Sequence, residues 1–144
     1  MQPLYRMVMC TAAALLLGAT LSSAAMADSA KTGAPVISLA DQQFGTILST
    51  RGHRALYYWN VEKRAGGKVR CTGACAAAWP PLIVRVASSV PRRLPNVKGT
   101  FGVIRRPDGR LQVTHNRLPI YTYAHEGPDQ VLCDDVDGWF VVRV

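Results

Sequence analysis

The amino-acid sequence predicts an all-β fold: a small antiparallel β domain built from two pseudo-repeats, with at most one short helical turn. Three observations predict it. The apolar runs are short, turn residues separate them, and one aromatic motif occurs twice. A length of 144 residues suits one domain. A hydrophobic content of 49% with 18% charged residues excludes an intrinsically disordered chain.

The first 27 residues have the three regions of a secretory signal peptide. Arg6 precedes an apolar stretch over residues 7–21, and a small-residue Ala-Met-Ala site ends at Ala27. We therefore expect cleavage after Ala27 and a periplasmic or secreted protein. An uncleaved membrane anchor is the alternative. The remainder has no apolar run of about 20 residues, so we expect no transmembrane span in the mature chain.

The mature chain divides into a leader and one domain. Residues 28–35 are small and polar and predict a flexible leader, and residues 36–144 form a single β-rich repeat domain. One helical turn is expected over residues 74–79, where alanines precede two prolines. The strand-like runs are residues 36–39, 44–48, 55–59, 101–104, 111–114, 120–123 and 138–142.

An internal repeat organises these strands. Repeat 1 covers about residues 44–82 and repeat 2 about residues 101–144, and a connector over residues 87–99 separates them. The connector has no clear period and predicts a solvated link, with a functional loop as the alternative. The similar pairs are residues 44–47 with 101–104, residues 56–62 with 120–126, and Trp79 with Trp139.

Each repeat contains an aromatic strand that is followed by a carboxylate. Tyr57 and Trp59 share one face of a strand because side chains two positions apart point the same way, and Glu62 follows three residues later. Such a carboxylate can accept hydrogen bonds from the next turn or pair with an arginine. We expect an aromatic core, with an exposed ligand platform as the alternative. The aromatic residues expected to be buried are Tyr57, Trp59, Trp79, Tyr121, Tyr123 and Trp139.

These residues carry a family resemblance. The chain resembles the secreted repeats of unknown function, predicted lipoproteins with a Tyr-x-aromatic-x-x-Asp motif, over about residues 44–144. The most specific segment is residues 71–82, which read C-x-G-x-C-A-x-x-W-P-P-L. The resemblance implies an exported β-rich domain and no established activity. The residues that match the family motifs are Tyr57, Trp59, Glu62, Trp79, Pro80, Pro81, Tyr121, Tyr123, Glu126 and Trp139.

This chain departs from the family pattern at three positions. Glu62 and Glu126 replace aspartates, which keeps the charge but lengthens the side chain. Cys133 stands where the second copy of the family usually lacks cysteine. The apolar segment also has no lipid-attachment motif, since Met9 precedes Cys10, so the lipoprotein label does not carry over.

Three cysteines remain after cleavage, and an exported compartment favours disulfides. Cys71 and Cys75 are close enough in sequence to pair at little loop-closure cost, so we expect that bond and a free Cys133. Aspartates within residues 134–137 would disfavour a Cys133 thiolate. The alternative is a bond from Cys133 to one of the other two, which would join the repeats.

No catalytic or cofactor motif is present. Cys133, His125 and His115 could form a mixed site for copper or zinc, but their spacing matches no metal motif, and we expect no cofactor. Serine nucleophile motifs and phosphate-binding glycine loops are absent. We therefore do not expect an enzyme, and enzyme activity is the further alternative.

The charge limits the partners. The chain has a net charge of +8, and residues 28–144 retain sixteen Lys and Arg against nine Asp and Glu, a charge of +7. Such a domain is attracted to an anionic envelope surface, whereas export and the lack of a binding motif argue against nucleic acid. We expect an exported non-catalytic binding or structural module of the cell envelope. A metal-handling or redox accessory protein of the periplasm is the alternative.

Overall fold

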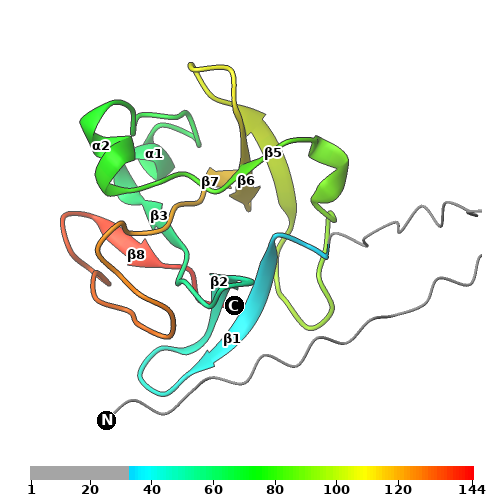
Figure 1. Cartoon of the computed structure of the whole chain (residues 1–144), viewed down its shortest axis with the longest axis vertical. Coiled ribbons are helices and arrows are strands. Elements are labelled where there is room, and N and C mark those ends of the chain that lie inside the picture. The colour runs from blue at the N-terminus through cyan, green and yellow to red at the C-terminus, as the bar shows by residue number, and fades with distance from the viewer. Residues whose placement is uncertain (1–32) are drawn as a thin grey trace, which may run out of the picture.

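The structure, a computed structural model, describes residues 33–144; the predicted signal peptide, its cleavage site at Ala27 and most of the predicted leader lie outside them. The fold is mostly β with small antiparallel sheets, as the sequence predicted, and its helices are short but more numerous than the single helical turn expected (Figure 1). Its elements are β1 (Val36–Asp41), β2 (Gly45–Thr50), β3 (Tyr57–Trp59), α1 (Asn60–Arg64), α2 (Ala74–Ala78), β4 (Ile83–Val84), the 3-10 turn η1 (Ala87–Ser89), β5 (Phe101–Arg105), β6 (Leu111–His115), β7 (Leu118–Pro119) and β8 (Trp139–Val141).

Of the two α-helices, the sequence predicts α2 and does not predict α1. α2 lies inside the segment where the helical turn was predicted, after Gly73, whose φ of 57° is a conformation that glycine adopts without strain. α1 was not expected. It follows β3 directly, and it carries Glu62, which is buried, in its first turn. The helix therefore places the Glu62 carboxylate in the protein interior.

Each half of the domain contains one β-hairpin, and the outermost residue pairs of the two hairpins correspond. In the first, β1 pairs with β2 and Val36 lies opposite Thr50; in the second, β5 pairs with β6 and Phe101 lies opposite His115. Val36 is therefore the counterpart of Phe101. The alignment of the two halves by sequence pairs residues 44–47 with residues 101–104, and the hairpin pairings show that this alignment is wrong. It aligned two Phe-Gly pairs, one in a hairpin turn and the other at the start of a strand.

The two halves exchange strands. β3 of the first half pairs with β8 of the second, and the two strands lie side by side in Figure 1 although they are far apart in the sequence. In the reciprocal contact, Pro81 of the first half forms a bridge with Tyr121 of the second. Tyr57 and Tyr121 form a bridge with each other between these pairs. Neither half can complete its aromatic strand without the other.

Matching rings of backbone hydrogen bonds repeat on both sides of this exchange. Leu48 N–H donates to the Val142 carbonyl, Val142 N–H to Leu56, and Leu56 N–H back to Leu48, at 2.8–3.0 Å. The second ring has the same pattern at 2.9–3.2 Å and joins Val113, Leu82 and Ile120. The rings satisfy buried backbone groups that short strands would otherwise leave unpaired.

The core consists of two clusters. The aromatic cluster contains both motif tyrosines with Trp79 and Trp139, and the aliphatic cluster packs Leu48, Leu56, Val113 and Ile120 between the hairpins. Side-chain alternation separates the clusters, because Tyr57 enters the first and its neighbour Tyr58 packs against the second. Of the six aromatic residues expected to be buried, Trp59 and Tyr123 are only half-buried.

Candidate functional site

The two motif tyrosines meet at the centre of the molecule. Tyr57 and Tyr121 are both fully buried, and each backbone N–H donates to the carbonyl of the other, at 2.8 and 2.9 Å. This mutual pairing relates the two halves as an approximate two-fold axis would. The motif is therefore a junction between the repeats.

The motif carboxylates cross this junction. The Tyr121 hydroxyl donates to Oε1 of Glu62 at 2.8 Å, and the Tyr57 hydroxyl donates to Oε1 of Glu126 at 2.5 Å. Each tyrosine thus bonds to the carboxylate of the opposite half. The sequence spacing predicts that these carboxylates receive hydrogen bonds from the following turn or pair with an arginine, and it does not predict the tyrosine of the other half as a partner.

Those turn contacts are present too. Oε1 of Glu62 accepts hydrogen bonds from the backbone N–H groups of Arg70 at 2.7 Å and Cys71 at 3.0 Å, and Oε1 of Glu126 accepts one from Leu132 at 2.6 Å. Each glutamate therefore holds its own loop and the tyrosine of the other repeat with one oxygen.

Burial sets the proton states of this cluster. Desolvation, strengthened by the adjacent carboxylate, raises the pKa of Tyr57 and of Tyr121 well above the usual 10.0, so both hydroxyls remain donors. Desolvation also raises the pKa of Glu126, against the opposing effect of its hydrogen bond from Tyr57. Protonated tyrosines that donate to buried carboxylates are suited to holding a structure together and supply no nucleophile.

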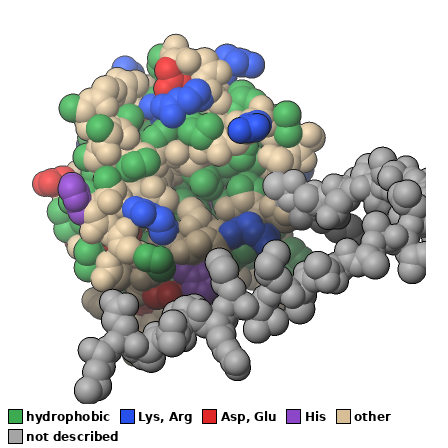
Figure 2. Space-filling view, in the orientation of Figure 1, with side chains coloured by type: hydrophobic (Ala, Val, Ile, Leu, Met, Phe, Trp, Pro, Cys, Tyr) green, Lys and Arg blue, Asp and Glu red, His purple; other side chains and the backbone are tan. Residues whose placement is uncertain are grey.

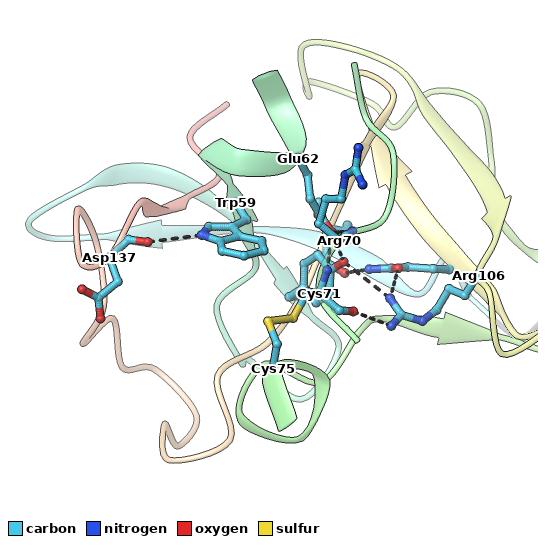
Figure 3. The surroundings of a disulfide bond; sticks show 10 residues. Trp59, Glu62, Arg70, Cys71, Cys75, Arg106 and Asp137 are labelled. Carbon is cyan, nitrogen blue, oxygen red and sulfur yellow. Dashed lines mark hydrogen bonds between the residues drawn. A yellow bond between two sulfur atoms is a disulfide. The ribbon is translucent and has the colours of Figure 1, made fainter. Parts of the chain in front are cut away.

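Sequence reasoning missed one charged residue of the core. The Arg106 side chain is buried, and its guanidinium donates to Gln112 Oε1 at 2.6 Å and to the Cys71 carbonyl at 2.7 Å (Figure 3). It also lies 6.0 Å from the centre of the Tyr121 ring. Arg106 follows a strand and precedes a Pro-Asp-Gly turn, where an exposed arginine is the ordinary expectation, and its position in the sequence contains no signal of burial.

The aromatic residues form a stacked ladder through the junction. Trp79 and Trp139 stack with ring centres 3.9 Å apart. Trp59 stacks on Trp139 at 5.3 Å, and Tyr123 packs on Trp79 at 4.6 Å. Each half supplies one tryptophan to the middle and one aromatic ring to an end, so the ladder follows the same approximate symmetry as the tyrosine pair.

The disulfide supports one side of this ladder. Cys71 and Cys75 are bonded (Figure 3), and Cys71 is fully buried. The Trp79 N–H donates to the Cys75 carbonyl at 2.7 Å. The bond ties the loop that Glu62 holds to the helix that precedes Trp79. Pro80 and Pro81 then lead the chain to Tyr121.

The residues considered for a metal site lie apart. Cys133 has a free, half-buried thiol, and desolvation, then Glu126 and Asp137, raise its pKa. His115 is buried against Phe101, with its Nε2 2.9 Å from the Lys98 carbonyl, whereas His125 is exposed beside Tyr123. No group of three or more metal-ligating side chains occurs within residues 33–144.

Open polar clefts lie on the surface. One of about 460 Å³ is bordered by Tyr58, Lys63 and His115, and another of about 550 Å³ by Arg92 and Arg117; Asn116 lines both. No Asp or Glu lines either cleft. Nothing in the sequence motifs marked these positions. Figure 2 shows basic side chains spread among hydrophobic and neutral ones over the visible face.

Comparisons with known proteins identify part of the chain. No curated protein and no solved structure matches it. Within residues 33–144, no helix is long and apolar enough to cross a membrane. The family that matches residues 38–83 is described as secreted, which is consistent with export. Residues 38–83, which hold the first tyrosine–carboxylate motif and the Cys-to-Trp-Pro-Pro segment, match the Lipoprotein_15 family, a secreted repeat of unknown function.

Proposed function

We propose that this protein is an exported, non-catalytic binding module of the cell envelope that associates with anionic partners. The observation that carries the proposal is unbalanced surface charge. Among the described residues, only Arg106, Arg110 and Arg143 of the Lys and Arg side chains pair with a carboxylate. Of the other basic side chains in this part of the chain, Arg54 and Arg105 donate to backbone carbonyls, and none is neutralised by a carboxylate at ion-pair distance.

Burial of acidic residues increases this imbalance. Glu62 and Glu126 lie in the core, where their hydrogen bonds hold the repeats together, so neither reduces the surface potential as an exposed carboxylate would. Asp108 and Asp134 are already paired with arginines. Arg106 is the one buried Lys or Arg side chain within residues 33–144, so two buried carboxylates against one buried guanidinium leave the surface slightly more positive than a residue count indicates, which favours long-range attraction to an anionic surface.

The motif residues support a non-catalytic role. Tyr57 and Tyr121 are fully buried, and their hydroxyls donate to carboxylates. A catalytic acid or nucleophile has to reach its substrate, and these groups do not lie in a cleft. Their contacts serve the assembly of the two repeats and leave the outer surface as the place for binding.

Sedimentation with lipid vesicles tests the proposal. We expect the exported protein to bind vesicles that contain phosphatidylglycerol in phosphatidylcholine, and to bind pure phosphatidylcholine vesicles weakly or not at all. Binding should fall steeply between low salt and 0.5 M salt, because ions screen exposed charges. Equal binding to both kinds of vesicle, or no binding to either, would contradict the proposal.

Elemental analysis tests the alternative, a metal-handling role. We expect no stoichiometric copper or zinc in the purified protein, because the structure does not bring Cys133, His115 and His125 together. Stoichiometric metal that is lost in a Cys133→Ser variant would favour the alternative over an anion-binding module.

A further inference from the structure

We infer that the cleft beside the β6–β7 turn is a binding site for a phosphate group. Arg92, Thr100, Gly102, Thr114, Asn116 and Arg117 line this cleft of about 550 Å³, and no carboxylate does. The volume lies in the range of small-molecule sites. The inference deepens the proposed function, since it names the chemistry and the place at which an anionic partner is recognised.

Apart from Phe101 and Gly102, the residues that line the cleft carry side-chain hydrogen-bond donors, and two of them are arginines. Arg92 and Arg117 make no ion pair among the described residues. The hydroxyl of Thr114, a residue only 3% exposed, makes no hydrogen bond within that part of the chain, although it lines the cleft. The Asn116 side-chain oxygen already accepts the Thr100 N–H at 3.0 Å, so its amide group remains to donate.

Phosphate fits this set better than a carboxylate does. Two guanidinium groups match the charge of about −1.5 to −2 on a phosphate monoester, and its three oxygens can accept the donors of the arginines, the threonine and the asparagine together. A carboxylate has one negative charge and two oxygens, so it leaves part of the set unused. The cleft is also larger than phosphate alone and leaves room for the group that bears it.

Backbone contacts hold the cleft in shape before any ligand binds. The Phe101 N–H donates to the Arg92 carbonyl at 2.9 Å, and the Asn116 N–H donates to the Thr100 carbonyl at 2.8 Å. The segment expected to be a solvated link between the repeats is thus fastened to β5 where it supplies Arg92. A preformed site loses less conformational entropy on binding.

Arg117 occupies an unfavourable backbone conformation at this turn. Its φ is 66°, and that of Asn116 is 49°, a pair of positive values that favours Asn-Gly in a two-residue hairpin turn. Glycine would fit the second position with less strain, and strained residues of this kind cluster at functional sites. Arg117 lines the cleft, and it brings a guanidinium group that glycine would lack.

Gly102 lines the cleft, and a side chain at this position would narrow it. A Cβ at this position would lie 3.2 Å from the Thr114 hydroxyl oxygen, and the backbone of Gly102 is not in the left-handed region. Alanine is therefore compatible with the strand but crowds the threonine hydroxyl. Gly102→Ala narrows the site with little change elsewhere.

Titration with inorganic phosphate, followed by NMR of the ¹⁵N-labelled exported protein, tests the site. We expect saturable shifts centred on the amides of Gly102, Thr114 and Asn116, sulfate to compete, and acetate to bind more weakly. Arg117→Gln should weaken phosphate binding by about tenfold or more, which corresponds to the loss of a charge-assisted hydrogen bond. Arg93→Gln is the matched control, because it removes the same charge from an exposed neighbour outside the cleft.

Two further variants separate binding from folding. Arg117→Gly should lose phosphate affinity while its melting temperature stays the same or rises, since glycine suits the backbone conformation. Gly102→Ala should also lose affinity and remain folded. Equal effects of Arg117→Gln and Arg93→Gln on phosphate affinity, or shifts spread over all surface arginines, would overturn the inference.

Vesicle binding distinguishes failure of the site from failure of the proposed function. If vesicles that contain phosphatidic acid, a lipid whose headgroup is a phosphate monoester, bind Arg117→Gln and Arg93→Gln equally well, and only free phosphate binding depends on Arg117, the source of the phosphate is soluble and not a lipid headgroup. If phosphate does not bind the cleft while anionic vesicles still bind the protein, the site is wrong and the broader proposal stands.

Discussion

Replacing Tyr121 with phenylalanine tests whether the crossed tyrosine–carboxylate contacts hold the two repeats together. The change removes one hydroxyl, which donates to Glu62 at 2.8 Å and accepts a long contact from the Arg106 guanidinium at 3.5 Å, and keeps the ring that packs at 5.1 Å against Trp139. Tyr58→Phe is the matched control. That residue is half-buried, and its hydroxyl makes no hydrogen bond within residues 33–144.

The expected loss in the free energy of unfolding depends on the contacts that remain after the substitution. A hydrogen bond to a charged group contributes about 1.5–3 kcal/mol to the free energy of unfolding. Phenylalanine leaves no cavity, and Oε1 of Glu62 keeps its bonds from the N–H groups of Arg70 and Cys71. We therefore expect a loss near the lower end, about 1.5–2 kcal/mol. The control should stay within about 0.5 kcal/mol, as surface changes usually do.

Urea unfolding followed by tryptophan fluorescence measures this difference. For a slope of about 1–3 kcal/mol per molar urea, Tyr121→Phe should lower the midpoint by roughly 1 M. In a Glu62→Ala background the same substitution should cost less, because the acceptor of the Tyr121 hydroxyl is gone and only the 3.5 Å contact from Arg106 remains, and a double-mutant cycle reports the coupling. If Tyr121→Phe and Tyr58→Phe shift the midpoint equally, the contact gives no net stability and the reasoning fails.

Three other outcomes follow from the same core. The Cys133 thiol should react with an alkylating reagent at pH 8 far more slowly in the folded than in the urea-unfolded protein, because burial and Glu126 raise its pKa; mass spectrometry that finds equal rates would contradict this. Burial raises the pKa of Glu126 above its ordinary 4.5, so the folded state binds this proton more tightly than the unfolded state does. The stability that this group contributes is complete below pH 4.5 and is lost as pH rises through the folded pKa, and melting curves of Glu126→Gln should lack that loss. Fragments covering residues 33–99 and 100–144 should each be unfolded by circular dichroism and should fold when mixed, since β3 pairs with β8; a fragment that folds alone would refute the strand exchange.

The sequence by itself determined the fold class and the local structure. Short apolar runs between turn residues cannot form long helices, and the four-residue spacing of Cys71 and Cys75 makes a local disulfide accessible without help from the rest of the chain. The same holds for Glu62, because the loop that follows a strand brings backbone donors within reach of a carboxylate there. These features depend on near neighbours in the chain.

Tertiary structure alone decided which repeat each side chain serves. The Tyr57 hydroxyl reaches Glu126 in the other repeat and not Glu62 in its own, and no local pattern distinguishes these two partners. The burial of Arg106 and the placement of Arg92 beside Arg117 likewise depend on contacts between distant segments. The physical reason is that strands this short are not stable by themselves and have to pair with strands from the other half. The stabilisation therefore arises only when the whole domain is assembled, and no single segment determines it.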